Sequence, residues 1–260
     1  MSDTPYLQRT FGLSRRTALL TGAGRGIGRA VALALGHAGA RVVVNDRRPE
    51  DCEETVGLLR QAGAEARAAA FDVSDRAAVM TAQHQLDADG WSVDILVSNA
   101  GVQNRKPLLE MRMEEWQALM DVHVHGALHC TQAFLPGMCS RGFGRVVMMS
   151  SVSAVATMPL IAAYSTAKAS LAALARAIAV EYGPYGVTAN AVAPGFVRTD
   201  FTVGLQQREG FEHFLQEAVP CARWAVPEDI APAVLFLTSP GGSFVNGQLL
   251  AIDGGMLARM

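Results

Sequence analysis

Several features that would mark a special environment or partner are scarce in this chain of 260 residues. Its four cysteines, Cys52, Cys130, Cys139 and Cys221, contain no C-x-x-C pair, so they indicate neither a zinc site nor a disulfide framework and favour a reducing cytoplasm. No apolar run approaches the roughly 20 residues of a membrane span. Lys plus Arg number 22 against 24 Asp plus Glu, which gives no basic surface for nucleic acid or an anionic membrane.

What is present is the composition of a compact globular protein. Half of the residues are hydrophobic, 18% are charged, and 25 are glycines, which suggests many tight turns. The chain shows no linker, internal repeat or low-complexity tract. We therefore expect residues 1–14 to be an N-terminal leader and residues 15–260 to form one domain.

A glycine-rich turn follows the first expected strand. The apolar segment 17–20 runs directly into T-G-A-G-R-G-I-G, and a helical pattern comes next. Strand, glycine turn and helix together form the context that a dinucleotide-binding fingerprint requires, because the backbone can approach a pyrophosphate at the helix N-terminus. The alternative is an ordinary strand-to-helix turn. The predicted cofactor contacts here are Gly22, Arg25, Gly26, Ile27 and Gly28.

An acidic residue ends the second expected strand. Asp46 lies about 20 residues beyond the glycine turn, where a carboxylate hydrogen-bonds the ribose hydroxyls of NAD and repels the extra phosphate of NADP. Arg25, Arg47 and Arg48 are competing signals, since each could pair with that phosphate. Asp46 could also cap the helix that follows Pro49. NAD is thus the favoured cofactor, with NADP as the alternative.

Strands and helices alternate along the rest of the chain, which predicts an α/β fold with a doubly wound, Rossmann-type parallel sheet. The expected strands are 17–20, 41–45, 66–71, 93–97, 145–149, 187–192 and 248–252. In such sheets ligands bind beyond the carboxyl ends of the strands. The residues expected to line that crevice are Asp72, Val73, Asn99, Ala100, Gly101, Pro194, Gly195, Val197 and Thr199.

Two stretches are harder to interpret. A long helix expected over residues 113–138 carries His123, His125 and His129, of which the last two are four apart and could form a metal pair. No carboxylate at ligand spacing completes such a site, so no metal is predicted. Residues 196–221 mix phenylalanines with charges and are predicted to form a mobile lid.

The main candidate for chemistry is a tyrosine and a lysine four residues apart. Tyr164 and Lys168 share one face of an expected helix. A nearby ammonium favours a phenolate and lowers the pKa of the phenol, which makes the pair a plausible general base. The alternative is a surface tyrosine and a solvated lysine.

These motifs together resemble the short-chain dehydrogenase/reductase family, from about Gly12 to the C-terminus. The residues that carry the resemblance are Thr21-Gly22-x-x-x-Gly26-x-Gly28, Asn99-Ala100-Gly101, Ser151 with Tyr164-x-x-x-Lys168, and Pro194-Gly195. The resemblance implies that Tyr164 exchanges the proton, that Lys168 lowers its pKa and holds the nicotinamide ribose, and that Ser151 hydrogen-bonds the substrate oxygen. It also implies a homotetramer.

One position departs from the family pattern. Where the family usually has a catalytic asparagine in a V-N-x-x-G segment, this chain has His123. The asparagine is thought to hold a water that links the lysine to solvent. His123 could offer a ring nitrogen to the same relay, or it could titrate near neutral pH.

A narrower similarity concerns the substrate. The segments around Gln103, Arg105 and Lys106, around Trp224, and from Phe244 to Leu257 are similar to those of gluconate 5-dehydrogenases. This predicts hydride transfer between NAD(P) and a secondary alcohol of a sugar acid or polyol. A cation just after the crevice turn, Arg105 or Lys106, could pair with the carboxylate of the substrate, and the alternative is a solvated loop. The alternatives are a 3-oxoacyl thioester reductase and a non-catalytic dinucleotide-binding regulator.

Overall fold

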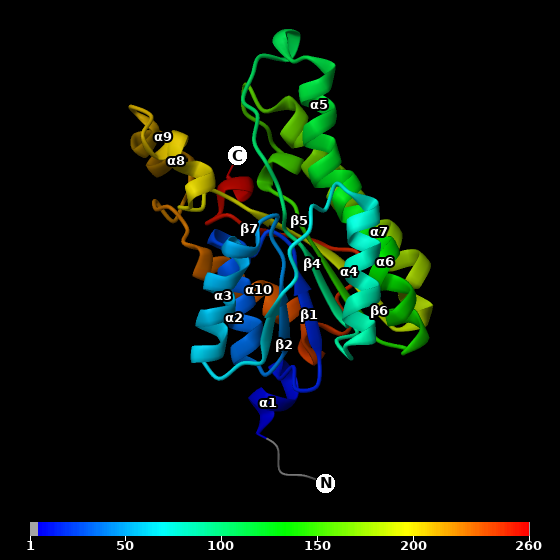
Figure 1. Ribbon diagram of the computed structural model, residues 1–260. Helices are drawn as coiled ribbons and strands as arrows, with labels where there is room; N and C mark the ends of the chain where they lie inside the picture. Colours follow the sequence, from blue (N-terminus) through cyan, green and yellow to red (C-terminus); the bar gives the residue numbers. More distant parts are fainter. Residues whose placement is uncertain (1–4, 260) are drawn as a thin grey trace.

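Seven parallel strands form the centre of the computed structural model, which describes residues 5–259 (Figure 1). Their order is β3-β2-β1-β4-β5-β6-β7, and every neighbouring pair is parallel. The strands are β1 (Thr17–Leu20), β2 (Arg41–Val44), β3 (Ala66–Ala68), β4 (Ile95–Ser98), β5 (Gly144–Met149), β6 (Val187–Pro194) and β7 (Leu249–Ile252). The predicted doubly wound, Rossmann-type sheet is confirmed.

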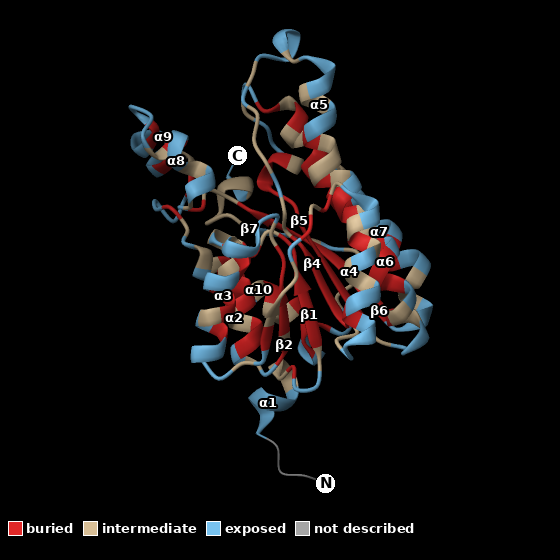
Figure 2. Cartoon of the chain, viewed as in Figure 1, coloured by how far each residue is buried: buried red, intermediate tan, exposed pale blue. Residues whose placement is uncertain are grey.

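Helices cover both faces of the sheet. One layer contains α2 (Gly26–His37), α3 (Pro49–Gln61) and α10 (Pro227–Thr238), and the other contains α4 (Arg76–Ala88), α6 (Gly126–Ser140) and α7 (Ala162–Tyr182). Figure 2 shows the buried residues concentrated in the strands and on the helix faces toward them. The strands are apolar throughout because both sides of a covered parallel sheet are buried.

The remaining helices lie outside these layers. They are α1 (Tyr6–Phe11), α5 (Met113–Met120), α8 (Val203–Gln206) and α9 (Phe211–Ala218). In Figure 1, α5 projects upward from the sheet and the α8–α9 lobe lies on the other side of the strand ends. These two projections flank the site described below.

The helix predicted over residues 113–138 is not continuous. A π-helical turn, Asp121–His125, joins α5 to α6, and the amide of Gly126 bonds the carbonyl of Asp121. Within this turn His123 is buried, whereas His125 is exposed. Single π turns of this kind are frequent at functional sites.

The third strand ends earlier than the predicted residue 71. β3 stops at Ala68, because the Asn45 side-chain amide donates to the carbonyls of Ala69 (2.9 Å) and Phe71 (3.1 Å). Those carbonyls are therefore satisfied without a ladder partner. The same bonds hold the end of β2 beside the chain that leads to Asp72.

The structure describes residues of both the predicted leader and the predicted lid. Within residues 1–14, positions 1–4 lie outside the described residues, α1 occupies Tyr6–Phe11, and Leu13 is buried in the core. The division of the chain at residue 14 stays a prediction. In the lid segment, Phe196 and Phe211 pack together with Trp224, which follows the segment, in a small hydrophobic core. Its mobility also stays a prediction.

No helix within residues 5–259 combines the length and the hydropathy needed to cross a bilayer.

Candidate active site

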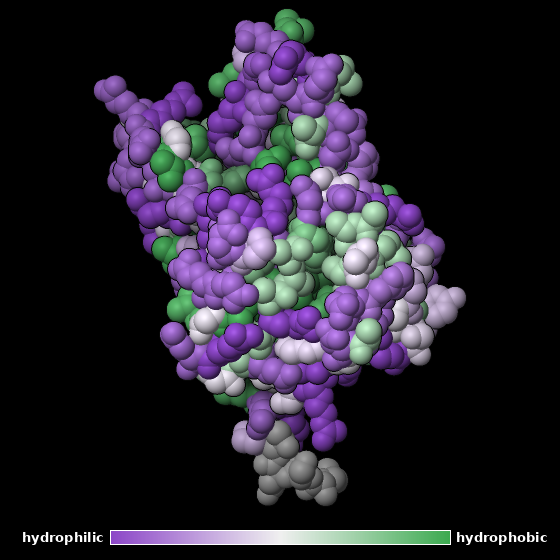
Figure 3. All heavy atoms as spheres, viewed as in Figure 1, coloured by the Kyte–Doolittle hydropathy of each residue, from purple (hydrophilic) through white to green (hydrophobic). Residues whose placement is uncertain are grey.

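A cavity of about 750 Å³ opens at the carboxyl ends of the strands. Figure 3 shows this side of the molecule as a hollow with hydrophobic residues inside it, between the α8–α9 lobe and the α5 projection. The structure brings every predicted cofactor and catalytic residue to this one cavity. They are Gly22, Arg25, Gly26, Ile27, Gly28, Asp46, Asp72, Val73, Asn99, Ala100, Gly101, His123, Ser151, Tyr164, Lys168, Pro194, Gly195, Val197 and Thr199.

The glycine turn has the geometry that a dinucleotide requires. Gly22 and Gly26 adopt φ values of +59° and +57°, which favour glycine. A Cβ on Gly28 would lie 2.3 Å from the Gly22 carbonyl oxygen. The N-terminus of α2 carries no side-chain cap, so its first amides are available to an anion. These residues fit the pyrophosphate of a nicotinamide dinucleotide.

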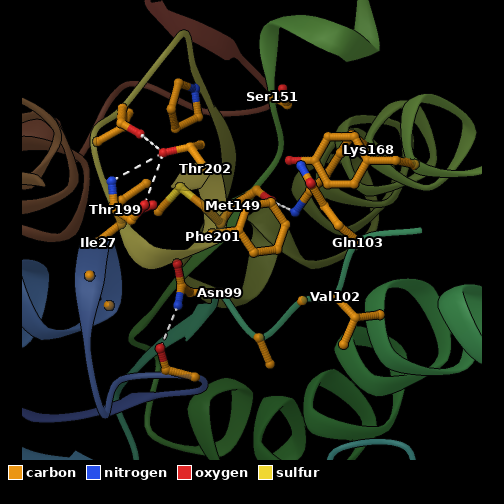
Figure 4. Close-up of a pocket in the computed structure, with 18 of the residues that line it drawn as sticks. Ile27, Asn99, Val102, Gln103, Met149, Ser151, Lys168, Thr199, Phe201 and Thr202 are labelled. Atoms are coloured by element: carbon orange, nitrogen blue, oxygen red, sulfur yellow. Dashed lines mark hydrogen bonds between the residues drawn. The ribbon is translucent and has the colours of Figure 1, made fainter. Parts of the chain in front are cut away.

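Asn99 connects the turn after β4 to the glycine turn. Its side-chain amide donates to the carbonyls of Thr21 (3.0 Å) and Gly22 (2.8 Å), as Figure 4 shows in part. The Thr21 hydroxyl in turn accepts from the amides of Asn99 (3.0 Å) and Ala100 (3.1 Å). Thr21 is thus a positioning residue, a role that the glycine motif did not predict.

The carboxylate of Asp46 is held at the end of β2. It accepts hydrogen bonds from the amides of Gly24 (3.3 Å) and Arg47 (2.8 Å). Among the competing arginines, Arg48 pairs with Asp51 at 2.7 Å and Arg25 lies 3.7 Å from Asp200. Arg47 makes no ion pair within residues 5–259. Asp46 and Arg47, the latter without an ion pair in the described chain, therefore lie in the part of the cavity expected to bind the ribose that carries the extra phosphate in NADP.

Tyr164 and Lys168 occupy the first two turns of α7, and both are enclosed by the cavity wall. Lys168 is 4% exposed, and its Nζ donates to the Met149 carbonyl at 2.7 Å. Burial without a carboxylate partner lowers the pKa of Lys168 to about 7. Burial raises the pKa of Tyr164 to about 12, while the hydroxyl of Ser151 and the charge of Arg105 act in the opposite direction. The pKa of Tyr164 is therefore raised, not lowered as predicted, because desolvation of the phenolate dominates.

Ser151 follows β5 and is held by its own chain. Its Oγ accepts the backbone amide of Ser153 at 3.1 Å, so one lone pair is already used. Ser150 Oγ donates to the Lys168 carbonyl at 2.7 Å and fastens α7 to the end of β5. Figure 4 shows Ser151, Lys168 and Gln103 reaching the same space from different elements.

His123 is buried beside Tyr164. It is 2% exposed, its ring meets that of Tyr164 edge-on at 5.6 Å, and Nε2 lies 2.8 Å from the Val102 carbonyl oxygen. Burial and the charge of Lys168 lower the pKa of His123 to about 3. The hypothesis that His123 titrates near neutral pH is therefore wrong, because the imidazole is neutral there. A Cβ on Gly101 would lie 2.4 Å from its ring, so the ring rests directly on that glycine.

His125 and His129, the other histidines of the helix predicted over residues 113–138, have protein partners. His125 Nδ1 lies 2.8 Å from Asp121 Oδ1, and His129 Nδ1 lies 3.1 Å from the Val73 carbonyl oxygen. Over residues 5–259, no three His, Cys, Asp or Glu side chains gather in a way that could hold a metal ion.

Three polar residues that follow the Asn99 turn differ in position. Gln103 and Arg105 line the cavity, and Arg105 Nε donates to Gln103 Oε1 at 3.1 Å. Lys106 does not line it. Its Nζ contacts both oxygens of Glu115, at 2.9 and 3.0 Å, which lowers the pKa of Glu115 to about 2. The prediction that Lys106 could contact a substrate carboxylate is therefore wrong. Arg105 has no ion pair in the described chain.

Several cavity residues were not predicted. Phe201 places its ring 6.1 Å from that of Tyr164, and Phe196, Arg198 and Thr202 line the same side. They lie within the irregular segment 196–221, where no periodic pattern indicates which side chains face inward. Met149 contributes a backbone carbonyl, a role that no residue type reveals.

Comparison with known proteins decides the family. A family model described as enoyl-(acyl carrier protein) reductase matches residues 22–257. The gluconate 5-dehydrogenase of Gluconobacter oxydans is 37% identical over 250 residues, which cover 96% of this chain and 98% of that protein. The chain belongs to the short-chain dehydrogenase/reductase family. It is an NAD(P)-dependent oxidoreductase that acts on CH–OH groups.

Other members of the short-chain dehydrogenase/reductase family are equally similar. The 3-oxoacyl-[acyl-carrier-protein] reductase of Synechocystis is 38% identical, covering 94% of this chain and 98% of that one. A solved gluconate 5-dehydrogenase from Burkholderia cenocepacia, in complex with NADP and tartrate, is 36% identical with a TM-score of 0.95. That match covers 98% of this chain and 100% of the solved chain. NADP in this and another solved relative means that an NAD preference is not shown.

Proposed function

We propose that this enzyme interconverts a sugar acid and its keto acid, of the gluconate/5-ketogluconate type. The observation that carries the proposal is Arg105, a guanidinium without an ion pair in the described chain, in the same cavity as Tyr164, Ser151 and Lys168. A carboxylate on the substrate would satisfy it through a charge-assisted hydrogen bond. Relatives named as gluconate 5-dehydrogenases, and the tartrate in one of them, support the same substrate class.

The chain's own residues supply the proton chemistry. Ser151, with one lone pair fixed by the Ser153 amide, directs its hydroxyl at the substrate oxygen. Tyr164 takes the proton of the alcohol during oxidation and returns it during reduction. The nicotinamide, when bound, accepts or delivers the hydride, and Lys168 is placed to hold its ribose. The cationic ring of the oxidised cofactor would lower the high pKa of Tyr164.

Arg105 gives the proposal its most direct test. Arg105→Gln should raise the KM for gluconate roughly 10- to 100-fold, because an unpaired charged hydrogen bond costs about 1.5–3 kcal/mol. Its KM for glucitol, which lacks the carboxylate, should change little. Arg112→Gln is the matched control, since Arg112 lies outside the cavity and contacts only Glu115. Equal increases in KM for gluconate and for glucitol in Arg105→Gln would contradict a carboxylate contact.

His123 is proposed to act in the proton path as a neutral acceptor. Its Nδ1 is buried and has no hydrogen-bond partner within residues 5–259, and Lys168 lies close enough to affect its charge. His123→Ala should lower kcat about 10-fold, the effect of losing one buried hydrogen bond. His123→Asn should recover most of it. Neither change should remove a step between pH 5 and 8 from the rate profile, because the imidazole does not titrate there.

NAD is proposed as the preferred cofactor because of Asp46. In Asp46→Ser, the ratio of kcat/KM for NAD to that for NADP should fall at least ~10-fold, since the ribose hydroxyls lose an acceptor and the 2′-phosphate loses a repelling charge. Arg47→Ala should shift the ratio the other way. A wild-type preference for NADP that Asp46→Ser leaves unchanged would show that Asp46 does not determine the choice between NAD and NADP.

Reduction of a 3-oxoacyl thioester is the second candidate, because the Synechocystis reductase is as similar as the gluconate enzymes. A non-catalytic regulator is less well supported, since Ser151, Tyr164 and Lys168 are all in place.

The proposed assembly is a cytoplasmic homotetramer that uses α5, α6 and α7 as one interface. Exposed apolar residues on these helices, such as Met113 and Val180, support it.

The function is tested by following nicotinamide absorbance with purified enzyme. Gluconate, 5-ketogluconate, glucitol and a 3-oxoacyl thioester are compared with each cofactor. We expect the highest kcat/KM with gluconate and 5-ketogluconate. Turnover of the thioester alone would replace it with the second candidate.

A further inference from the structure

Two residues that line the active-site cavity each have a buried polar side-chain atom without a partner within residues 5–259. Within residues 5–259, five side-chain atoms are buried and make no hydrogen bond: Ser98 Oγ, His123 Nδ1, Arg145 Nε, Ser153 Oγ and Thr188 Oγ1. Of their residues, only His123 and Ser153 line the cavity. An unsatisfied buried hydroxyl destabilises a fold, and it calls for an explanation such as a ligand that completes it.

Ser153 is attached rigidly to the catalytic serine. It lies in the single turn Val152–Ala154 directly after Ser151 and is 8% exposed. Its backbone amide donates to Ser151 Oγ at 3.1 Å, so the two serines lie on the same part of the wall. The amide of Ser153 thus has its partner in Ser151, whereas its hydroxyl has none within residues 5–259.

We propose that Ser153 is a specificity residue whose hydroxyl binds a substrate hydroxyl close to the reacting carbon. This inference rests on the proposed function, in which Ser151 binds the oxygen on the reacting carbon itself. Because the two serines are joined through one amide, a group that reaches Ser153 Oγ belongs to a carbon near the reacting one. In a sugar acid, those neighbouring carbons carry hydroxyls.

The chemistry of the serine hydroxyl suits this partner. A hydroxyl both donates and accepts, and its hydrogen rotates to fit, so it can satisfy another hydroxyl in either role. In a 3-oxoacyl thioester the carbons next to the ketone are CH₂ groups, which would leave Ser153 unpaired. A site built to hydrogen-bond a substrate hydroxyl discriminates strongly against an analogue that lacks it. Ser153 would therefore favour polyhydroxylated substrates over acyl chains.

The test uses two ketones of matched length. 5-Ketogluconate and 5-oxohexanoate share the carboxylate and the ketone at C5, but only the first carries hydroxyls on the neighbouring carbons. Ser153→Ala should lower kcat/KM for 5-ketogluconate about 10-fold, the effect of one hydrogen bond. Its effect on 5-oxohexanoate, measured as substrate or as competitive inhibitor, should be less than 2-fold. Ser153→Thr, which keeps a hydroxyl, should retain the preference for 5-ketogluconate.

Stability separates this role from a structural one. Removing an unsatisfied buried hydroxyl should leave the Tm of Ser153→Ala at or above that of the wild type. Ser98→Ala and Thr188→Val are the controls: they also remove partnerless hydroxyls, but outside the cavity, so they should keep wild-type kinetics. Equal effects of Ser153→Ala on the two ketones, or none on either, would overturn the inference alone. If the wild type reduced no sugar acid, the proposed function would fail and this inference with it.

Discussion

Tyr164→Phe should lower kcat at least ~10³-fold, within the range attributed to a general acid–base group. The change removes one oxygen and keeps the ring that packs against His123 and Phe201. Ser151 would still bind the substrate oxygen, but no side chain would take its proton. Cofactor affinity, measured by fluorescence titration of the reduced nicotinamide, should change less than 3-fold.

Tyr185→Phe is the matched control. Tyr185 is 55% exposed and follows α7 at the far end from the cavity. This variant should keep wild-type kcat with every substrate. Retention of more than a tenth of the wild-type rate by Tyr164→Phe would exclude the phenol as the proton-exchanging group.

Lys168→Met should separate activity from stability. The lysine is buried, and within residues 5–259 its ammonium contacts the Met149 carbonyl but no carboxylate. A methionine of similar length avoids the desolvation of that charge, so the variant should unfold at a higher temperature than the wild type. Its kcat/KM should fall roughly 10²-fold or more, because the ribose and the phenolate lose their nearest cation. Cofactor binding should weaken as well.

The stability gain should depend on pH in a defined direction. The pKa of Lys168 is about 7 in the folded protein, below the ordinary lysine value of 10.5. Between these values the unfolded chain binds more protons, so the stability of the wild type rises with pH across that window. The difference in Tm between Lys168→Met and the wild type should therefore be largest below pH 7 and shrink toward pH 10. A constant difference would show that the charge of Lys168 is not its cause.

Local patterns were sufficient to predict the fold and which residues would gather at the carboxyl ends of the strands. Gly22, Gly26 and Gly28 interrupt an apolar strand and a helix at a fixed spacing, and that spacing has one common structural meaning. Alternation of short apolar runs with amphipathic helices indicated the doubly wound sheet. Once the strand ends were placed, the crevice residues followed, because parallel strands present their carboxyl ends at the same edge.

Properties that depend on three-dimensional surroundings could not be predicted. Lys106 and Arg105 are adjacent cations, and only tertiary structure shows that Lys106 is taken by Glu115 while Arg105 lines the cavity. The pKa of His123 depends on burial that the π turn creates. The partnerless hydroxyl of Ser153 is equally invisible in the sequence, because serine is common and most serines find a partner.

The proposed reaction transfers a hydride from the nicotinamide to C5 of a keto sugar acid. It is tested most directly by reducing 5-ketogluconate with NADH or NADPH that carries deuterium on the transferable C4 position, and by locating the label in the product by NMR. We predict one deuterium at C5 of the resulting hydroxy acid and none elsewhere, with Tyr164→Phe giving no labelled product under the same conditions. Absence of the label from C5, with label entering a 3-oxoacyl thioester instead, would contradict the assignment.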